Sequence, residues 1–374
     1  MIYTKGEKFM KKLLAALLSA AMVLGLTACL SDAVTPPQTQ AASTTTTQAA
    51  APAETTAAAA APAETKAPET QPTAPDFPTK TIQCIIPYAP GGGSDILTRA
   101  IMSTLALPND QVLAAINVEG AAGFTGCMQA SMQPNDGYFI LAHNPMDVVS
   151  YSLSGIDETA MYKNLEMICC VVADYNVFST NKQTGLKTVD EVVEYAKAHP
   201  GELKMAVTGT TTVNFADANR LLRDLGIADC VTIVPHNGGA DCMTALLGNH
   251  VQLCFESSVD SRATIDSGDT IPLMTIGTKR AQYLPDVACS AELGYSCQTA
   301  KPRGYYAPAG TDPEKIKVIA DSIKTAIEQQ EFIDTCANLG LEIDFRYADE
   351  IQPDIELWAD QLQPIFDELI NTQQ

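Results

Sequence analysis

Basic side chains are scarce in this sequence. Lys and Arg together number 23, against 44 Asp and Glu, so the formal charge is −21. Nucleic acid is bound through a positively charged surface, and this balance argues against it as a partner. Long apolar runs are also rare, because nothing after residue 28 approaches the roughly 18 apolar residues of a membrane helix. The later part of the chain is therefore expected to fold outside the membrane.

The motifs of several enzyme classes are missing as well. The glycines at 91–93 lack the GxGxxG spacing of a dinucleotide site, and no GK[ST] follows them. GxSxG, HExxH and EF-hand spacings are absent too. The 11 cysteines show no CxxC pair or other metal spacing. We therefore expect no catalytic residues, no metal and no other cofactor, and we interpret the ten cysteines after Cys29 as buried small apolar residues.

The first residues indicate export. Met10, Lys11 and Lys12 form a positive region, and 13–26 is an apolar run of about 14 residues, too short to span a membrane but typical of a signal peptide. The run ends in "LTAC" at 26–29, which resembles a lipobox. We predict that 1–28 is a lipoprotein signal peptide and that Cys29 is lipidated. Ordinary secretion, with Cys29 incidental, is the alternative.

Residues 29–76 are mostly Ala, Thr, Pro, Glu and Gln, with "APAET" at 51–55 and again at 61–65. Such a low-complexity stretch cannot build a core and is interpreted as a disordered linker. An acylated cysteine followed by a tether predicts a protein held at the extracytoplasmic face of a bacterial cell membrane.

Residues 77–374 show strand-like runs alternating with helical patterns. Alternation of this kind predicts an α/β fold with parallel sheets and helices on both faces. The predicted strands are 81–88, 138–143, 166–173, 203–208, 231–236, 251–257 and 271–277. The predicted helices are 94–107, 188–198, 213–225, 239–248, 257–267, one opening at Asp312-Pro313-Glu314, and a long amphipathic one from Ile351 to Leu369, kinked at Pro364.

The stretch "IIPYAPGGGSDILTRAI" at 85–101 joins a strand to a helix through three glycines. This arrangement can expose backbone N–H groups at a helix N-terminus, which is a site for an anion. Other loops rich in Gly, Ser, Thr and Asn follow strands at 117–126, 208–214 and 235–241. Each alone could be a turn with a helix cap. Together they predict a cleft lined by hydrogen-bond donors with little fixed charge, and His143 and His236 lie at strand ends where they could line it.

The blocks "PYAPGGGSD", "NVEGAAGFTG", "PNDGYFILA", "VPHNGGADCMTALLGNH", "LPDV" and "YYAPAGTDPEKI" carry a resemblance. Over the whole of 77–374 the sequence resembles the tripartite tricarboxylate transporter receptors, the TctC-like or Bug-type extracytoplasmic solute-binding proteins. The resemblance implies a two-domain type II periplasmic-binding-protein fold with an interdomain ligand cleft and two crossing connections. It places 77–177 with 303–374 in the first domain and 178–302 in the second, with crossings near 175–178 and 299–305.

The resemblance also implies what is bound. The ligand is a small organic acid, namely a di- or tricarboxylate, an acidic amino acid or an aromatic acid, which is delivered to membrane permease subunits. Loops 90–95 and 120–126 would pinch one carboxylate without Arg or Lys, with Asp95 capping the helix or orienting water. Thr210, Thr211, Thr212, Asn214, His236 and Glu256 would read the other end. The remaining predicted ligand-binding residues are Tyr88, Pro90, Gly91, Gly92, Gly93, Ser94, Asp95, Ala122, Gly123, Phe124, Thr125, Asn144, Gly239 and Ala240.

Two other functions stay open at this point. A ligand-sensing receptor subunit of a signalling system would have the same fold, and a secreted hydrolase could use the same cleft. We expect a monomer that does not bind nucleic acid.

Overall fold

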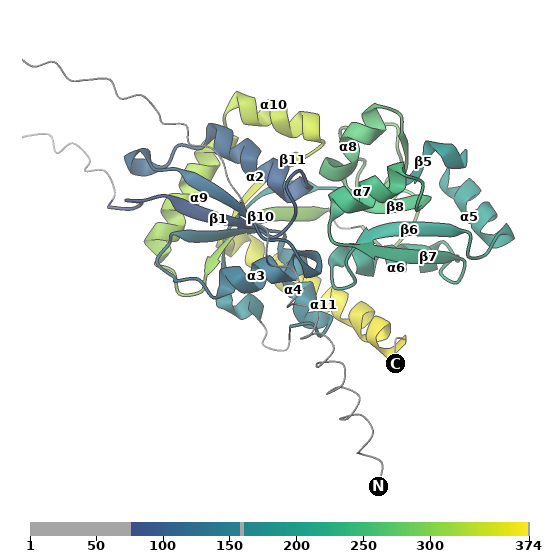
Figure 1. Ribbon diagram of the computed structural model, residues 1–374, viewed down its shortest axis with the longest axis horizontal. Helices are drawn as coiled ribbons and strands as arrows, with labels where there is room; N and C mark the ends of the chain where they lie inside the picture. The colour runs from purple at the N-terminus through teal and green to yellow at the C-terminus, as the bar shows by residue number, and fades with distance from the viewer. Residues whose placement is uncertain (1–75, 158–160, 299, 373–374) are drawn as a thin grey trace, which may run out of the picture. The chain divides into compact units, whose positions relative to one another are not determined.

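The computed structural model describes residues 76–157, 161–298 and 300–372. The predicted signal peptide, Cys29 and the linker up to residue 75 lie outside these ranges, so those predictions remain untested. The described part forms two sheets with packed helices, in two lobes that lie side by side (Figure 1). We call the six-stranded sheet with its helices lobe 1, and the five-stranded sheet with its helices lobe 2. No helix in the described ranges has the length and apolar character needed to cross a membrane.

The lobe 1 sheet has the strand order β11-β4-β10-β3-β1-β2. The three strands at one side of this sheet, β3, β1 and β2, are parallel, with Cys84 of β1 in register with Ala115 of β2 and Ile140 of β3. The continuous apolar sequence of β1 suits a strand that is covered on both faces. The strands are β1 (Ile82–Ile86), β2 (Leu113–Asn117), β3 (Phe139–His143), β4 (Leu165–Asp174), β10 (Lys301–Pro308) and β11 (Glu342–Tyr347).

The lobe 2 sheet has the order β7-β6-β8-β5-β9. Here β6 lies between β7 and β8, as β1 lies between β2 and β3 in lobe 1, and the three strands are parallel, with Met205 of β6 opposite both Ile233 and Leu253. The strands are β5 (Asn176–Asn181), β6 (Leu203–Thr208), β7 (Val231–His236), β8 (Leu253–Ser257) and β9 (Thr270–Thr275).

Each sheet receives one strand that arrives from the other lobe. β4 ends at Asp174 and β5 begins at Asn176, so a single residue separates the two sheets; β10 makes the return crossing. Both crossing strands are antiparallel to their two neighbours. The prediction of purely parallel sheets is therefore wrong for these strands and for β11. A strand that enters from the other lobe starts where the parallel strands end, so it must run against them. The exact domain boundaries stay a prediction.

The helices begin near the predicted residues. Thr188 Oγ1 accepts a hydrogen bond from the Glu191 N–H at 3.1 Å, and Asp312 Oδ1 accepts one from the Glu314 N–H at 3.0 Å, so each of these side chains caps the start of its helix. The α-helices are α2 (Gly93–Thr104), α3 (Phe124–Ser131), α4 (Pro145–Leu153), α5 (Val189–Ala198), α6 (Val213–Asp224), α7 (Gly239–Leu247), α8 (Ser258–Asp266), α9 (Pro313–Ile327), α10 (Gln330–Leu339) and α11 (Ala348–Thr372). Short 3-10 turns span Pro108–Asp110, Ala121–Gly123, Met161–Asn164 and Lys182–Thr184.

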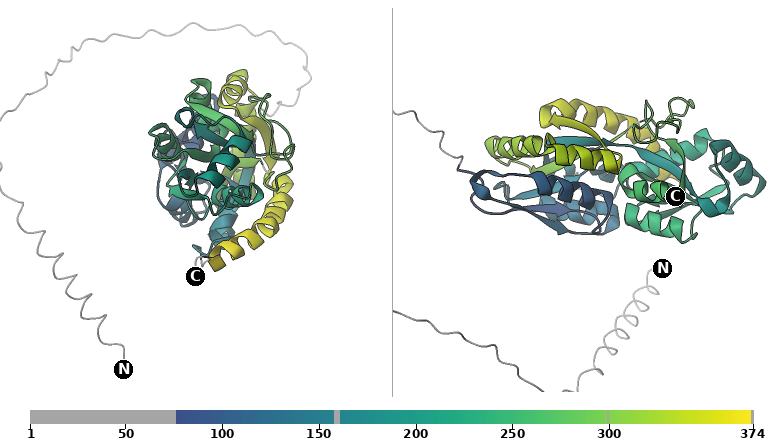
Figure 2. Two further views of the ribbon diagram at one scale, coloured as in Figure 1. Left: turned by 90° about the vertical axis from the view of Figure 1, so that its right-hand side faces the viewer. Right: turned by 90° about the horizontal axis from the view of Figure 1, so that it is seen from above.

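The terminal helix α11 joins the two lobes. It packs on α4 of lobe 1 and on α6 of lobe 2, and Arg223 of α6 forms an ion pair with Glu368 (Figure 2). Trp358, Leu362 and Phe366 belong to a buried apolar cluster that includes residues of both sheets. The ten described cysteines are free thiols and all but Cys230 are buried, which agrees with their interpretation as small core residues.

Candidate ligand-binding site

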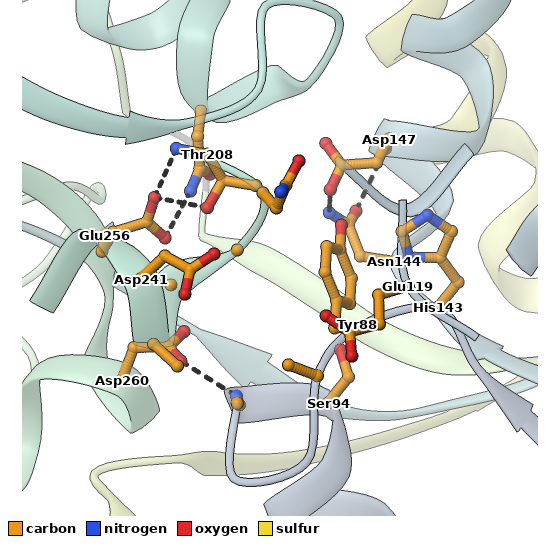
Figure 3. A pocket seen from close by; sticks show the side chains of 18 of the residues that line it. Tyr88, Ser94, Glu119, His143, Asn144, Asp147, Thr208, Asp241, Glu256 and Asp260 are labelled. Atoms are coloured by element: carbon orange, nitrogen blue, oxygen red, sulfur yellow. Dashed lines mark hydrogen bonds between the residues drawn. The ribbon is translucent and has the colours of Figure 1, made fainter. Parts of the chain in front are cut away.

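A cavity lies between the lobes, where the carboxyl ends of β1, β2 and β3 face those of β6 and β8 (Figure 3). In lobe 1 the strand β1 has β2 on one side and β3 on the other, and in lobe 2 β6 has β7 and β8 on its two sides. Ligands of open α/β sheets bind outside such reversals of strand order. The lining residues are Tyr88, Ala89, Gly92, Gly93, Ser94, Glu119, His143, Asn144, Asp147, Thr208, Asn214, Asn237, Gly238, Gly239, Ala240, Asp241, Glu256, Asp260, Lys301 and Arg303.

Nine of the predicted site residues line this cavity. They are Tyr88, Gly92, Gly93, Ser94, Asn144, Asn214, Gly239, Ala240 and Glu256. A second, more open hollow is lined by four others, namely Ala122, Thr210, Thr211 and His236. The rest lie beside these spaces and hold the loops in shape: Pro90, Gly91, Asp95, Gly123, Phe124, Thr125 and Thr212.

The glycine loop is fixed by its own lobe. Asp95 Oδ2 accepts a hydrogen bond from the Gly91 N–H at 2.9 Å, and the same carboxylate forms an ion pair with Arg99 at 2.9 Å. Burial acts to raise the pKa of Asp95, but hydrogen bonds from Arg99 and Gly91 lower it below its ordinary value. Asp95 therefore braces the turn before α2, while the N-cap position itself, Gly92, has no side-chain cap. Gly91 has a φ of +83°, a conformation that glycine adopts without strain.

Two helix N-termini are occupied by carboxylates of the opposite lobe. Asp260 of α8 accepts a hydrogen bond from the Gly93 N–H of α2 at 2.9 Å, and Figure 3 draws this contact across the gap between the lobes. Asp147 of α4 likewise accepts one from the Val213 N–H of α6 at 2.8 Å. A carboxylate at a helix N-terminus is favoured by the helix dipole. In this structure Asp260 therefore occupies the N-terminus of α2 at the glycine loop, and ligand binding there stays a prediction.

The prediction that the cleft carries little fixed charge is wrong, whereas binding of a carboxylate by the glycine loops without Arg or Lys stays a prediction. Lys301 and Arg303 both lie on the crossing strand β10 and line the cavity. The Arg303 guanidinium contacts Asp174 at 2.6 Å, Ser94 Oγ at 2.9 Å and Ser257 Oγ at 3.0 Å. It therefore ties the two lobes together. The signal available in the sequence was the pair of basic residues two apart in "KPRGYY", which in a strand point to one face.

Lys301 differs from Arg303 in its partners. Its side chain is buried, and the ammonium donates a hydrogen bond to Asn214 Oδ1 at 3.0 Å. Among the ion pairs of the described residues, none includes Lys301. Its charge opposes the raised pKa values of the buried carboxyl groups of Asp147, Asp217 and Glu256, and the ammonium has two further N–H donors that a bound anion can accept.

Glu256 is held by a dense set of donors. Its Oε1 accepts hydrogen bonds from the Thr208 N–H and hydroxyl, both at 2.6 Å, and Oε2 accepts one from Asn214 Nδ2 at 3.0 Å. Burial raises the pKa of Glu256, which nearby Lys301 partly opposes. Asn214 therefore links Glu256 to Lys301 inside the cavity.

His143 has one ring nitrogen without a partner. Tyr151 donates its only hydroxyl proton to the Ala122 carbonyl at 2.9 Å, so the 2.9 Å contact between Tyr151 Oη and His143 Nε2 requires His143 to donate. The proton is therefore on Nε2, and Nδ1 is a bare acceptor, buried and without a hydrogen-bond partner. Burial, followed by Lys301 and Arg303, lowers the pKa of His143 to about 3.

The second hollow lies between the loop around Ala122 and the loops after β6 and β7. Ala121 and Ala122 have positive φ angles of 45° and 53°, and a Cβ added at Gly209 would lie 2.4 Å from the Ala122 side chain. The two lobes therefore also touch here. Phe124 packs edge-on against Tyr151, and Thr212 caps α6 through the Phe215 N–H at 3.3 Å. Within the described ranges, no group of His, Cys, Asp and Glu is placed to hold a metal ion.

Two sheets of equal strand order that exchange one strand each, with a cavity between them, define a class of protein. They are the architecture of the type II periplasmic-binding proteins, and the predicted fold class is confirmed. The chain belongs to the tripartite tricarboxylate transporter family receptors (TctC), whose family profile matches residues 97–370.

Individual relatives agree with this assignment. Protein BugT of Bordetella pertussis is 28% identical over 295 residues, which cover 77% of this chain and 90% of BugT. The solved periplasmic binding protein BugD is 23% identical with a TM-score of 0.71, over 78% of this chain and 98% of BugD. MatC from Rhodopseudomonas palustris, solved with bound malate, is 20% identical with a TM-score of 0.70, over 78% of this chain and 100% of MatC. At these identities the two structures establish a shared fold.

Proposed function

We propose that this protein captures a small organic acid between its lobes and delivers it to a membrane transporter of the tripartite tricarboxylate type. Its family consists of receptors, and MatC, which shares the fold, binds malate. The observation that carries the proposal is Lys301, a buried ammonium in the cavity whose hydrogen bond goes to a neutral amide. A ligand carboxylate would accept hydrogen bonds from the remaining N–H groups of this ammonium.

Capture requires the lobes to part and close again. Three polar contacts bridge them at the cavity: Asp260 with the Gly93 N–H, Asp147 with the Val213 N–H, and Arg303 with Ser257. Polar contacts of this kind can be exchanged for water as the lobes open, unlike a buried apolar interface. The proposed hinges are the one-residue link at Tyr175 and the start of β10. Hinge closure needs only a few residues at the ends of such elements.

The location follows from the N-terminal sequence. The apolar run at 13–26 followed by "LTAC" supports export and acylation at Cys29, and the Ala/Thr/Pro-rich linker supports a tether at the extracytoplasmic face of the membrane. A receptor held there delivers its ligand to permease subunits in the same membrane. In this role the protein binds and releases its ligand unchanged.

Native mass spectrometry of the full chain, purified in mild detergent, tests the proposal. A co-purified small molecule containing a carboxyl group is the expected result, and it should leave the protein chemically unaltered. A co-purified molecule without a carboxyl group would refute the organic-acid proposal. Conversion of the molecule by the purified protein would instead favour the hydrolase.

A further inference from the structure

The cavity carries more negative than positive charge. Five lining residues are carboxylates, two are cations, and one of those cations, Arg303, already contacts Asp174 at 2.6 Å behind the cavity. Lys301 is therefore the lining cation left for a ligand. A second ligand carboxylate would enter a space in which like charges dominate, and like charges at contact distance repel strongly where water is scarce.

The five carboxylates fall into two groups. Asp147, Glu256 and Asp260 are buried and take hydrogen bonds from the protein. Glu119 and Asp241 are exposed, and no hydrogen bond or ion pair of the described residues involves their side chains. Glu119 comes from lobe 1 and Asp241 from lobe 2, and Figure 3 shows both beside the cavity. Closure thus brings two free negative charges to the same cavity.

The unpaired ring nitrogen of His143 independently indicates that the ligand has a hydrogen-bond donor. The ring lines the cavity, its Nε2 proton is committed to Tyr151, and Nδ1 is a buried acceptor without a donor. A buried acceptor that lacks a donor is costly. A carboxylate cannot satisfy it, because an ionised carboxylate only accepts hydrogen bonds. A protonated amine satisfies Nδ1 and the free carboxylates together.

We propose that the ligand is a small organic acid that also carries a protonated amine, with its carboxylate at Lys301 and its ammonium group toward His143, Glu119 and Asp241. This inference rests on the proposed function and narrows its ligand class to acids whose net charge is not negative. Di- and tricarboxylates without an amine are excluded, because their second negative end would meet the acidic residues.

A series of probes that differ only at their ends tests this. All four probes have four carbons. Butyrate carries one negative end and succinate carries two. 4-Aminobutyrate carries one negative and one positive end, and 1,4-diaminobutane carries two positive ends. The five- and six-carbon analogues cover longer spacings. Binding to the full chain is measured by isothermal titration calorimetry. We expect the amino acid of the best-fitting length to bind at least tenfold more tightly than both the mono- and the dicarboxylate.

The outcomes separate the two proposals. A dicarboxylate that binds most tightly overturns the amine and leaves the organic-acid function standing. If a diamine binds most tightly, the organic-acid function is refuted, and the proposed position for an ammonium group is retained. Binding of no probe at millimolar concentration overturns both.

Charge variants locate the ammonium position. The Glu119→Gln/Asp241→Asn double variant should lose at least tenfold in affinity for the amino acid and should narrow the preference over the dicarboxylate. Both residues are exposed, so folding should be unaffected. The control is Glu328→Gln/Glu331→Gln, which changes the net charge equally through exposed residues distant from the cavity. Equal discrimination in the double variant and the control would remove Glu119 and Asp241 from the site. His143→Phe, which removes the acceptor, should weaken the amino acid more than butyrate.

Discussion

Replacing Lys301 by Met tests its ligand-binding role, because affinity and stability can both be measured on the same variant. Met keeps most of the apolar stem and removes the charge. The Lys301 side chain is 7% exposed and its hydrogen bond goes to Asn214 Oδ1, which also receives Asn176 Nδ2 at 3.0 Å. Asn214 therefore keeps a donor in the variant. Lys301 lies in no ion pair of the described residues, but its charge opposes the raised pKa values of the buried Asp147, Asp217 and Glu256, so the variant should have a lower free energy of unfolding.

The variant should also bind its ligand more weakly. A hydrogen bond to a charged group contributes about 1.5–3 kcal/mol, so losing the contact between Lys301 and a ligand carboxylate should weaken affinity roughly 10- to 150-fold. The assay is calorimetric titration with the tightest-binding probe of the series, and urea unfolding of the same preparation. Lys204→Met, at an exposed position of β6, is the control with equal charge loss. A Lys301→Met protein that is less stable but binds as tightly as the wild type would refute the reasoning.

Three further predictions concern other parts of the chain. Labelled fatty acid should enter the wild type and not Cys29→Ala, and equal labelling of both would contradict the lipid anchor. The pKa of His143 is about 3, below its ordinary 6.5, so the folded protein binds fewer protons than the unfolded chain between these pH values. The contribution of His143 to the free energy of unfolding should therefore be complete above pH 6.5 and decrease as the pH falls toward 3. Thermal unfolding followed against pH should show a less steep decrease in His143→Gln. A methyl group at Gly93 would lie 2.9 Å from Arg303 and 3.0 Å from Asp260, so Gly93→Ala should push the lobes apart and raise the radius of gyration in small-angle scattering. A methyl group at Gly92 would lie 3.4 Å from the Ala89 carbonyl, so the free energy of unfolding of Gly92→Ala should match that of the wild type within about 1 kcal/mol.

The strand, loop and helix around the three glycines could be predicted because the signals there are local. An apolar run, a glycine turn and a helical spacing of Leu97 and Ile101 follow one another within twenty residues, and β1 and α2 appear where these signals lie. The helix caps at Thr188 and Asp312 were also predictable, since each depends on a side chain two or three residues from its partner.

The crossing strands could not be predicted in this way. β10 contains Pro302 and Gly304, which weaken any strand pattern, and it is stabilised by pairing with β3 and β4, more than a hundred residues earlier. Missing this strand meant missing Lys301 and Arg303. Similarly, Thr210, Thr211 and His236 lie in the second hollow because the approach of the two lobes divides the cleft, and no local pattern encodes that approach.

The exchange of strands makes the two lobes one cooperative unit. β5 is paired on both sides in lobe 2 but follows directly from β4 of lobe 1, and β10 is paired on both sides in lobe 1 but is reached only through lobe 2. Unfolding of either sheet therefore destabilises a strand of the other sheet. Neither lobe can be excised, permuted or exchanged with that of a relative as a self-contained module. A ligand that tightens one lobe also protects the other from proteolysis, although the two cores are built from different stretches of the chain.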